Sequence, residues 1–276
     1  MSGDLVEGRG QRNLREKTIE INDLVVHYRK TGAGLPVVFL HGLAEDGSSW
    51  DEVVAGVGDG VAAYAVDFRG HGGTTFGDGN GTVGQLADDL NAFLEKVTGS
   101  AVCVGFSLGG VITLEAALRR PDLARMVVVV GSSSKVGRAA AGFFAERIEL
   151  LTRDPEAFRI ALATDTAAQI VRRKESLDSV NAKRLRAVGE GAGYVNAARA
   201  MLELALAPMT ERLREIKVPV HIIQARDDVF CPVKAAGILR EAIPAAGYSE
   251  IPCAGHLITV DQPDLLAAEI RRILKI

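Results

Sequence analysis

The sequence predicts an α/β fold, a mostly parallel eight-stranded sheet flanked by helices with an inserted helical cap. Short runs rich in valine and isoleucine alternate with longer segments of helical periodicity, which is typical of successive strand–helix–strand units. Several runs, such as residues 127–130, are apolar at every position, as expected for strands buried on both faces of a parallel sheet. The chain has 276 residues, enough for one large domain with a sizeable core.

The first segment, residues 1–17, is polar and mixed in charge, so we expect a flexible tail and not a secretory signal. Apolar runs then place the strands, in chain order, at residues 18–21, 24–29, 37–40, 61–66, 101–104, 125–130, 220–224 and 247–251. Helical periodicity places the helices that cover the sheet at residues 81–97, 107–119, 232–243 and 263–274.

The alternation stops between residues 135 and 217, where only helical patterns follow one another. We therefore expect a core of residues 18–134 and 218–276, with residues 135–217 forming a helical cap over the carboxyl edge of the sheet. Asp154 followed by Pro155 is a typical helix start within this segment. Its apolar candidates for a pocket lining are Phe143, Phe144, Phe158, Leu162, Tyr194, Met201 and Leu204.

Composition excludes several classes of protein. The chain is 47% hydrophobic and 24% charged, with a net charge of −3, which gives no basic surface for nucleic acid. No apolar run approaches the ~20 residues that span a bilayer, so we expect no membrane partner. The three cysteines are too few for a disulfide scaffold and show no zinc-binding spacing. These features predict a protein of the reducing cytoplasm.

The most informative motif is Gly105–Phe106–Ser107–Leu108–Gly109, which lies directly between an apolar run and a helical pattern. A nucleophile elbow needs this arrangement, because a sharp strand-to-helix turn exposes the serine hydroxyl and the glycines leave room for neighbouring backbone. The helix that follows also favours developing negative charge at its N-terminus. The alternative is a glycine-rich turn in which the serine is incidental.

A serine nucleophile needs a base, and the base needs an acid that orients it. His256 follows the strand at 247–251, and Asp228 follows the strand at 220–224, so the chain order is Ser107, Asp228, His256, as expected for this motif. Asp227 is the alternative acid. Two cysteines lie on the same loops as the acid and the histidine, and we expect two free thiols although pairing stays open: Cys231 and Cys253.

With these motifs, the chain resembles α/β-hydrolase fold proteins from Thr18 to Leu274, apart from the cap. The resemblance rests on five motifs: His41–Gly42, the run from Asp67 to Gly72, the elbow, Asp228-x-x-x-Pro232 and Gly255–His256. It implies that Ser107 is the nucleophile, Asp228 the orienting acid and His256 the base. It further implies an oxyanion hole formed by the backbone N–H groups of Leu43 and Leu108. In such proteins, histidines at positions like 41 and 71 shape loops beside the site.

The serine at the elbow indicates the reaction class. Relatives that dehalogenate or open epoxides are expected to carry an aspartate at this position, whereas Ser107 indicates acyl transfer. We expect a serine hydrolase that cleaves a small, apolar carboxylic ester or lactone through an acyl-enzyme, with no metal and no organic cofactor. Hydrolysis of a C–C bond, perhydrolysis, cofactor-free oxygenation and a ligand-binding receptor on the same fold remain alternatives. The oligomeric state is not predicted.

Overall fold

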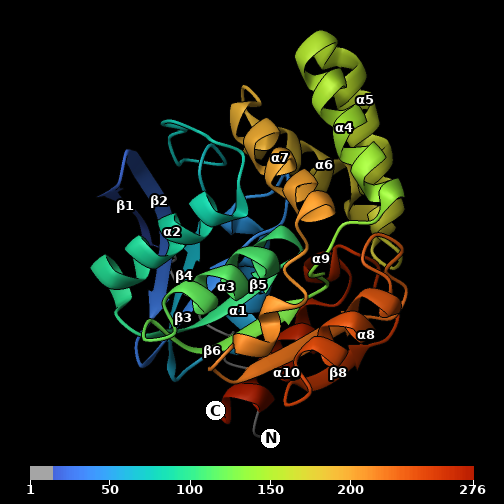
Figure 1. The fold of residues 1–276 in the computed structure, drawn as a ribbon. Helices are drawn as coiled ribbons and strands as arrows, with labels where there is room; N and C mark the ends of the chain where they lie inside the picture. The colour runs from blue at the N-terminus through green and yellow to red at the C-terminus, as the bar shows by residue number, and fades with distance from the viewer. Residues whose placement is uncertain (1–14) are drawn as a thin grey trace, which may run out of the picture.

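The computed structural model describes residues 15–276, so most of the predicted tail lies outside the described residues. In these described residues, eight strands form one sheet in the order β1-β2-β4-β3-β5-β6-β7-β8 (Figure 1). β2 pairs antiparallel with β1 and β4, and all other neighbours pair parallel. The strands are β1 Arg15–Ile21, β2 Leu24–Gly32, β3 Leu35–Leu40, β4 Val61–Val66, β5 Ala101–Phe106, β6 Ala124–Val130, β7 Val220–Ala225 and β8 Gly247–Ile251.

The predicted sheet is confirmed, with shifts at some strand ends. β1 begins at Arg15 because residues 15–17, predicted to be tail, pair with residues 28–30 of β2. Their side chains are exposed, so no apolar pattern marks them as a strand. β5 runs two residues further than predicted, to Phe106, and therefore carries the start of the glycine–serine motif.

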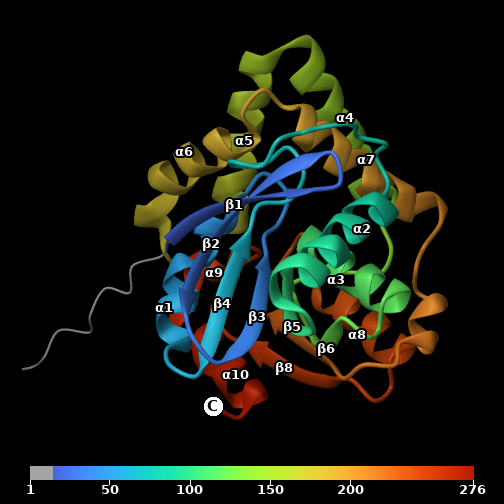
Figure 2. The same cartoon turned by 90° about the vertical axis from the view of Figure 1, so that its left-hand side faces the viewer.

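Helices cover both faces of the sheet (Figure 2). The apolar core on one face includes side chains of α2 (Val83–Phe93), α3 (Leu108–Arg119) and α8 (Val233–Ala242). The core on the other face includes side chains of α1 (Asp51–Val57), α9 (Ile258–Asp261) and α10 (Pro263–Leu274). Every residue of β4 and β5 is buried, as expected for strands between two helical layers.

The helix α2 is shorter than the helix predicted for residues 81–97. It starts at Val83 because the Thr82 hydroxyl caps it by accepting a hydrogen bond from the Gln85 N–H. At its other end the chain widens into a π-helical turn over Leu94–Thr98. The predicted helix of residues 81–97 therefore combines a capping residue, a helix and a turn.

A helical segment lies between β6 and β7, above the edge of the sheet to which the parallel strands point (Figures 1 and 2). Within residues 135–217, all of which the structure describes, there is no strand. Asp154 caps α5 by accepting from the Ala157 N–H, and Pro155 is the first residue of that helix, as predicted. The main helices of the segment are α4 Arg138–Arg153, α5 Pro155–Gln169, α6 Leu177–Val188 and α7 Ala192–Leu206.

None of the helices in residues 15–276 is both long enough and apolar enough to cross a membrane.

Candidate active site

Ser107 occupies a sharp turn between β5 and α3. Its backbone has φ 52° and ψ −116°, a conformation that a residue with a side chain rarely adopts. Its N–H donates to the Val130 carbonyl of β6 at 2.9 Å, which holds the turn against the neighbouring strand. The chain enters the helix at Leu108, the next residue. This is the strand–turn–helix geometry that the sequence motif predicts.

The two glycines of the motif are required by close packing of the backbone. A Cβ atom on Gly105 would lie 2.2 Å from the Gly109 carbonyl oxygen. A Cβ atom on Gly109 would lie 2.5 Å from the Leu40 carbonyl oxygen and 2.6 Å from that of His41. Because these contacts are with backbone atoms, neither could be relieved by moving a side chain. The predicted reason for the glycines is confirmed.

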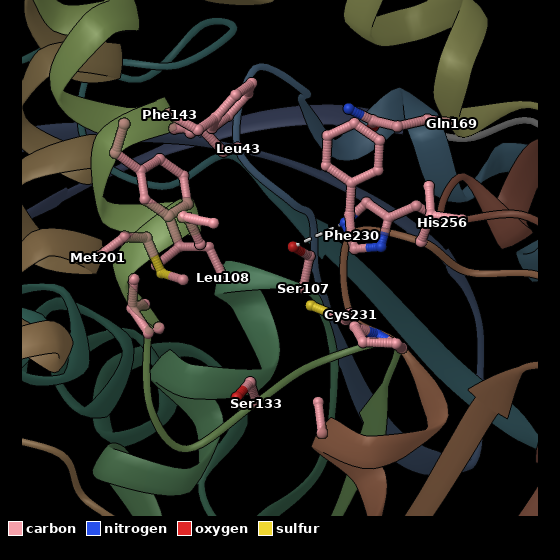
Figure 3. Close-up of a pocket in the computed structure, with 18 of the residues that line it drawn as sticks. Leu43, Ser107, Leu108, Ser133, Phe143, Gln169, Met201, Phe230, Cys231 and His256 are labelled. Carbon is pink, nitrogen blue, oxygen red and sulfur yellow. Dashed lines mark hydrogen bonds between the residues drawn. The ribbon is translucent and has the colours of Figure 1, made fainter.

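Ser107, His256 and Asp228 lie in one chain of hydrogen bonds. The distance from Ser107 Oγ to His256 Nε2 is 3.1 Å, and that from His256 Nδ1 to Asp228 Oδ2 is 2.7 Å. The three residues come from loops that follow β5, β7 and β8, so parallel strands bring them to one edge of the sheet. Figure 3 shows Ser107 and His256 among the residues that line the cavity, with a dashed line for the hydrogen bond between them. The aspartate and the histidine are both buried.

The second carboxylate oxygen of Asp228 fixes its orientation. Oδ1 accepts from the backbone N–H groups of Phe230 and Cys231, each at 2.8 Å, which leaves Oδ2 for His256. The alternative acid, Asp227, is exposed, and its backbone N–H donates to the Ala254 carbonyl. The structure therefore brings Asp228, and not Asp227, to the histidine.

The loop after β3 places Leu43 at the same cavity as Ser107 and Leu108. Leu108 is the first residue of α3, so its N–H has no partner within the helix. The loop is held by Glu45, whose Oε2 accepts from the Gly42 N–H at 3.0 Å, and by Arg184, whose Nη2 lies 3.5 Å from the Leu43 carbonyl oxygen. Burial raises the pKa of the Glu45 carboxyl. The predicted oxyanion hole is compatible with these positions and stays a prediction.

A cavity of about 650 Å³ lies over the serine. Phe230, which the sequence analysis did not single out, forms part of its wall and stacks on the His256 ring with centroids 5.6 Å apart. Phe158 and Leu204 were candidates for the lining but are buried in packing instead, Phe158 against the Tyr194 ring. The candidates that do line the cavity are Phe143, Phe144, Leu162, Tyr194 and Met201.

Sequence comparison agrees with this architecture. A sequence model described as "Alpha/beta hydrolase family" matches residues 37–269. The chain belongs to the alpha/beta hydrolase family. The match begins within β3 and ends within α10, so it spans the sheet edge that carries Ser107, Asp228 and His256.

Relatives within this family are distant in sequence and similar in fold. The 3-oxoadipate enol-lactonase 2 of Acinetobacter baylyi is 26% identical over 264 residues, which cover 94% of this chain and 96% of that protein. A thermophilic esterase from Thermogutta terrifontis has a TM-score of 0.81 at 22% identity, covering 95% of this chain and 98% of its own. The enol-lactonase from Burkholderia xenovorans LB400 has a TM-score of 0.82 at 22% identity, and the match covers 94% of this chain and 100% of that structure. The two structures show the fold.

His41 and His71 are buried in the loops beside the site. The His41 ring stacks on Phe68 with centroids 3.9 Å apart, and its Nδ1 hydrogen-bonds the Gly42 carbonyl oxygen. Burial lowers the pKa of both histidines, that of His71 to about 3. Neutral imidazoles packed in this way shape the loops, in agreement with the role that the family resemblance implies.

The three cysteines are free thiols, so no disulfide joins Cys231 to Cys253. Cys231 lines the cavity, and burial raises the pKa of its thiol, which keeps the thiol protonated. Cys253 is exposed. In residues 15–276, no group of three or more histidine, cysteine, aspartate or glutamate side chains could hold a metal ion.

Proposed function

We propose that this member of the alpha/beta hydrolase family is a serine hydrolase that cleaves a small carboxylic ester or lactone. The observation that carries the proposal is the hydrogen-bonded chain from Ser107 through His256 to Asp228, opening into a largely apolar cavity. The esterase and lactonase names among its relatives support the same reaction class.

In the first half of the reaction, His256 Nε2 takes the proton of the Ser107 hydroxyl while Oγ attacks the carbonyl carbon of the substrate. The tetrahedral intermediate carries its negative charge on the former carbonyl oxygen. When the intermediate collapses, the bond to the leaving oxygen breaks and the His256 proton passes to that oxygen. An alcohol leaves, or the lactone ring opens, and the acyl group stays on Ser107.

In the second half, a water molecule replaces the alcohol. His256 takes one proton from the water, the hydroxide oxygen attacks the acyl carbon, and the Ser107 oxygen leaves with the proton that His256 returns. The products are a carboxylic acid and the free enzyme. No metal or organic cofactor takes part in either half.

Several groups stabilise the charges that form. Asp228 faces the imidazolium, and the N–H groups of Leu43 and Leu108 are the proposed donors to the oxyanion. The loss of one such donor costs about 10²–10³ in kcat in a comparable enzyme. The N-terminus of α3, which starts at Leu108, adds a favourable dipole.

We also propose that residues 135–217 act as a cap that selects the substrate. Phe143, Phe144, Leu162, Tyr194 and Met201 come from this segment and give the cavity much of its apolar wall. An apolar wall of this kind favours a small aliphatic or aromatic acyl group. The free thiols at all three cysteines fit the predicted cytoplasmic location.

The proposal is tested by labelling with a fluorophosphonate, which reacts with an activated serine. We expect one covalent adduct, mapped to Ser107 by peptide mass analysis. Ser107→Ala should abolish it. Ser133→Ala is the matched control, because Ser133 lines the same cavity but its hydroxyl donates to the Lys135 carbonyl. Labelling that survives Ser107→Ala, or its absence from the wild type, would remove the basis for a serine hydrolase.

A substrate screen separates the hydrolase from a ligand-binding receptor. p-Nitrophenyl esters of increasing acyl length and several lactones are followed for both turnover and protein melting temperature. A hydrolase should turn over at least one class faster than ~1 s⁻¹ and show a steep dependence on acyl length. Uniformly slow hydrolysis with a large ligand-induced rise in melting temperature would favour the receptor.

A further inference from the structure

Arg184 of α6 is a buried arginine in the wall of the cavity. It is only 6% exposed. Its Nη1 donates to the Thr166 hydroxyl at 2.8 Å, and its Nη2 lies 3.5 Å from the Leu43 carbonyl oxygen. Its Nε is buried and has no hydrogen-bond partner in the described part of the chain. A guanidinium group carries five N–H donors, so its hydrogen-bonding capacity is not exhausted.

This arginine differs from the other buried arginine of the described residues. Arg69 forms paired contacts with the carboxylates of Asp23 and Asp89. No described carboxylate oxygen lies within 4.0 Å of the Arg184 guanidinium, which is absent from the ion pairs between residues 15 and 276. Burying an unpaired charge is costly, so a permanent charge in such a position calls for an anion that the protein itself does not supply.

Two acidic side chains lie near Arg184, and each has another partner. The Asp165 carboxylate accepts hydrogen bonds from both Nε and Nη2 of Arg147, at 2.8 and 2.9 Å. Glu45 accepts from the Gly42 N–H and forms no hydrogen bond or ion pair with Arg184, although the Arg184 charge partly opposes the rise that burial causes in the pKa of its carboxyl. Neither side chain therefore supplies the full counter-charge that Arg184 lacks.

The remaining charges around the cavity have the same sign. Besides Arg184, its lining includes Lys135, Arg138 and Lys234, and among residues 15–276 the only acidic side chain in the lining is that of Asp165, which is already paired. A positive cavity in a chain of net charge −3 attracts anions to this place.

We propose that Arg184 binds an anionic group of the substrate, and that this group is a carboxylate. The guanidinium fork matches the two oxygens of a carboxylate. This inference rests on the proposed function and narrows its substrate class. Because Arg184 lies beside Leu43, we expect a short chain of substrate atoms between this carboxylate and the carbonyl that Ser107 attacks. Suitable substrates are half-esters of short dicarboxylic acids and lactones that carry a carboxylate.

The wild-type protein provides the first test. Monomethyl succinate, glutarate and adipate are compared with methyl butanoate, pentanoate and hexanoate, in which a methyl group replaces the carboxylate. Acid release is followed with a pH indicator. We expect kcat/KM for at least one half-ester to exceed that of its neutral partner by ~10-fold or more, as a charge-assisted hydrogen bond allows. A wild-type preference for every neutral ester would overturn the proposal, whether or not the variants fold.

Variants of α6 then assign the preference to Arg184. In Arg184→Gln, the ratio of kcat/KM for the half-ester to that for the neutral ester should fall roughly 10- to 100-fold. Arg184→Lys keeps the charge without the paired N–H donors of a guanidinium and should retain part of the preference for the half-ester. Arg186→Gln is the matched control, since Arg186 is exposed on the same helix, and its ratio should equal that of the wild type. An unchanged ratio in folded Arg184→Gln would refute the assignment.

A binding measurement keeps this proposal separate from the proposed function. Ser107→Ala is titrated by calorimetry with monomethyl glutarate and with dimethyl glutarate. Tighter binding of the monoanion supports the role of Arg184 even if the wild type hydrolyses no ester and takes no label. Equal or tighter binding of the neutral diester overturns it even if Ser107 is labelled.

Discussion

Replacing Asp228 by asparagine should prevent His256 from acting as a base while leaving the position of its ring unchanged. Oδ1 of Asp228 accepts hydrogen bonds from the N–H groups of Phe230 and Cys231, so the amide oxygen of an asparagine must take that place. Its NH₂ group then faces His256 Nδ1, where the carboxylate oxygen was. An NH₂ group donates, so the imidazole proton moves to Nε2, and Nε2 can no longer accept the Ser107 proton.

The size of the effect follows from the same contacts. Turning the amide over would restore the tautomer but would break two buried hydrogen bonds, at a cost of about 1–3 kcal/mol each. The orientation in which the asparagine NH₂ group faces His256 Nδ1 therefore predominates. In a serine protease, the wrong histidine tautomer lowers kcat by about 10⁴, which corresponds to ~5.5 kcal/mol of transition-state stabilisation. We expect a loss approaching this value and little change in the melting temperature.

The assay compares this variant with Asp227→Asn, which makes the same chemical change at the adjacent, exposed carboxylate. Steady-state hydrolysis of the best ester gives kcat, and the rate of fluorophosphonate labelling reports on Ser107 independently of substrate binding. Asp227→Asn should stay within a few-fold of the wild type. A larger loss at Asp227 would transfer the role to that residue, and two near-normal variants would refute the reasoning from tautomers.

Two further predictions concern stability. Gly109→Ala should lower the unfolding free energy by roughly 2–4 kcal/mol because the new Cβ would meet the Leu40 carbonyl. Gly142→Ala, on an open helix surface, should raise it by about 0.5–1 kcal/mol. Chemical denaturation measures both changes, and equal effects would contradict the packing argument. His71 stays neutral in the folded protein because its pKa is about 3 and not its ordinary 6.5, so its contribution to stability is present above pH 6.5 and is lost as the pH falls toward 3. His71→Phe should therefore reduce the slope of unfolding free energy between pH 6 and 4 by roughly 1.4 kcal/mol per pH unit, and urea titrations that give parallel slopes would disprove this.

The parts of the fold that the sequence predicted well are those with a local signal. Residues 61–66 and 127–130 are apolar throughout because helices cover both faces of the sheet. The turn at Ser107 was predictable because its glycine pattern is local, and Gly105 is required by the Gly109 carbonyl four residues away, although Gly109 is required by the distant Leu40 carbonyl at the end of β3. Asp154 was predictable as a helix cap for the same reason, since its acceptor role concerns only the first turn of α5.

The features that sequence reasoning missed depend on contacts between distant segments. Residues 15–17 are polar and join β1 only through backbone pairing. Phe230 follows the predicted acid, but only the approach of the loops after β7 and β8 places its ring on His256. Arg184 stands between Lys183 and Leu185 in a stretch that reads as a solvated helix face.

A signal for Arg184 was nevertheless present in the helical spacing. Ala187 and Val188 follow it by three and four residues, so they share its face of α6, and both are buried. A charged residue on the apolar face of a helix is buried with that face, and a buried charge requires a partner or a function. The sequence could therefore have marked Arg184 as unusual, although it could not have placed it in the lining of the same cavity as Ser107.

The contact between Arg184 and Leu43 joins the two parts of the site. The sheet edge supplies Ser107, His256 and Asp228, and the helical segment supplies much of the apolar wall. Arg184 reaches from that segment to the carbonyl of Leu43, whose N–H is a proposed oxyanion donor. We therefore expect a change at Arg184 to affect substrate binding and the chemical step together. For this reason the ratio of rates on charged and neutral esters, and not either rate alone, measures charge recognition, because a disturbed oxyanion loop slows both esters alike.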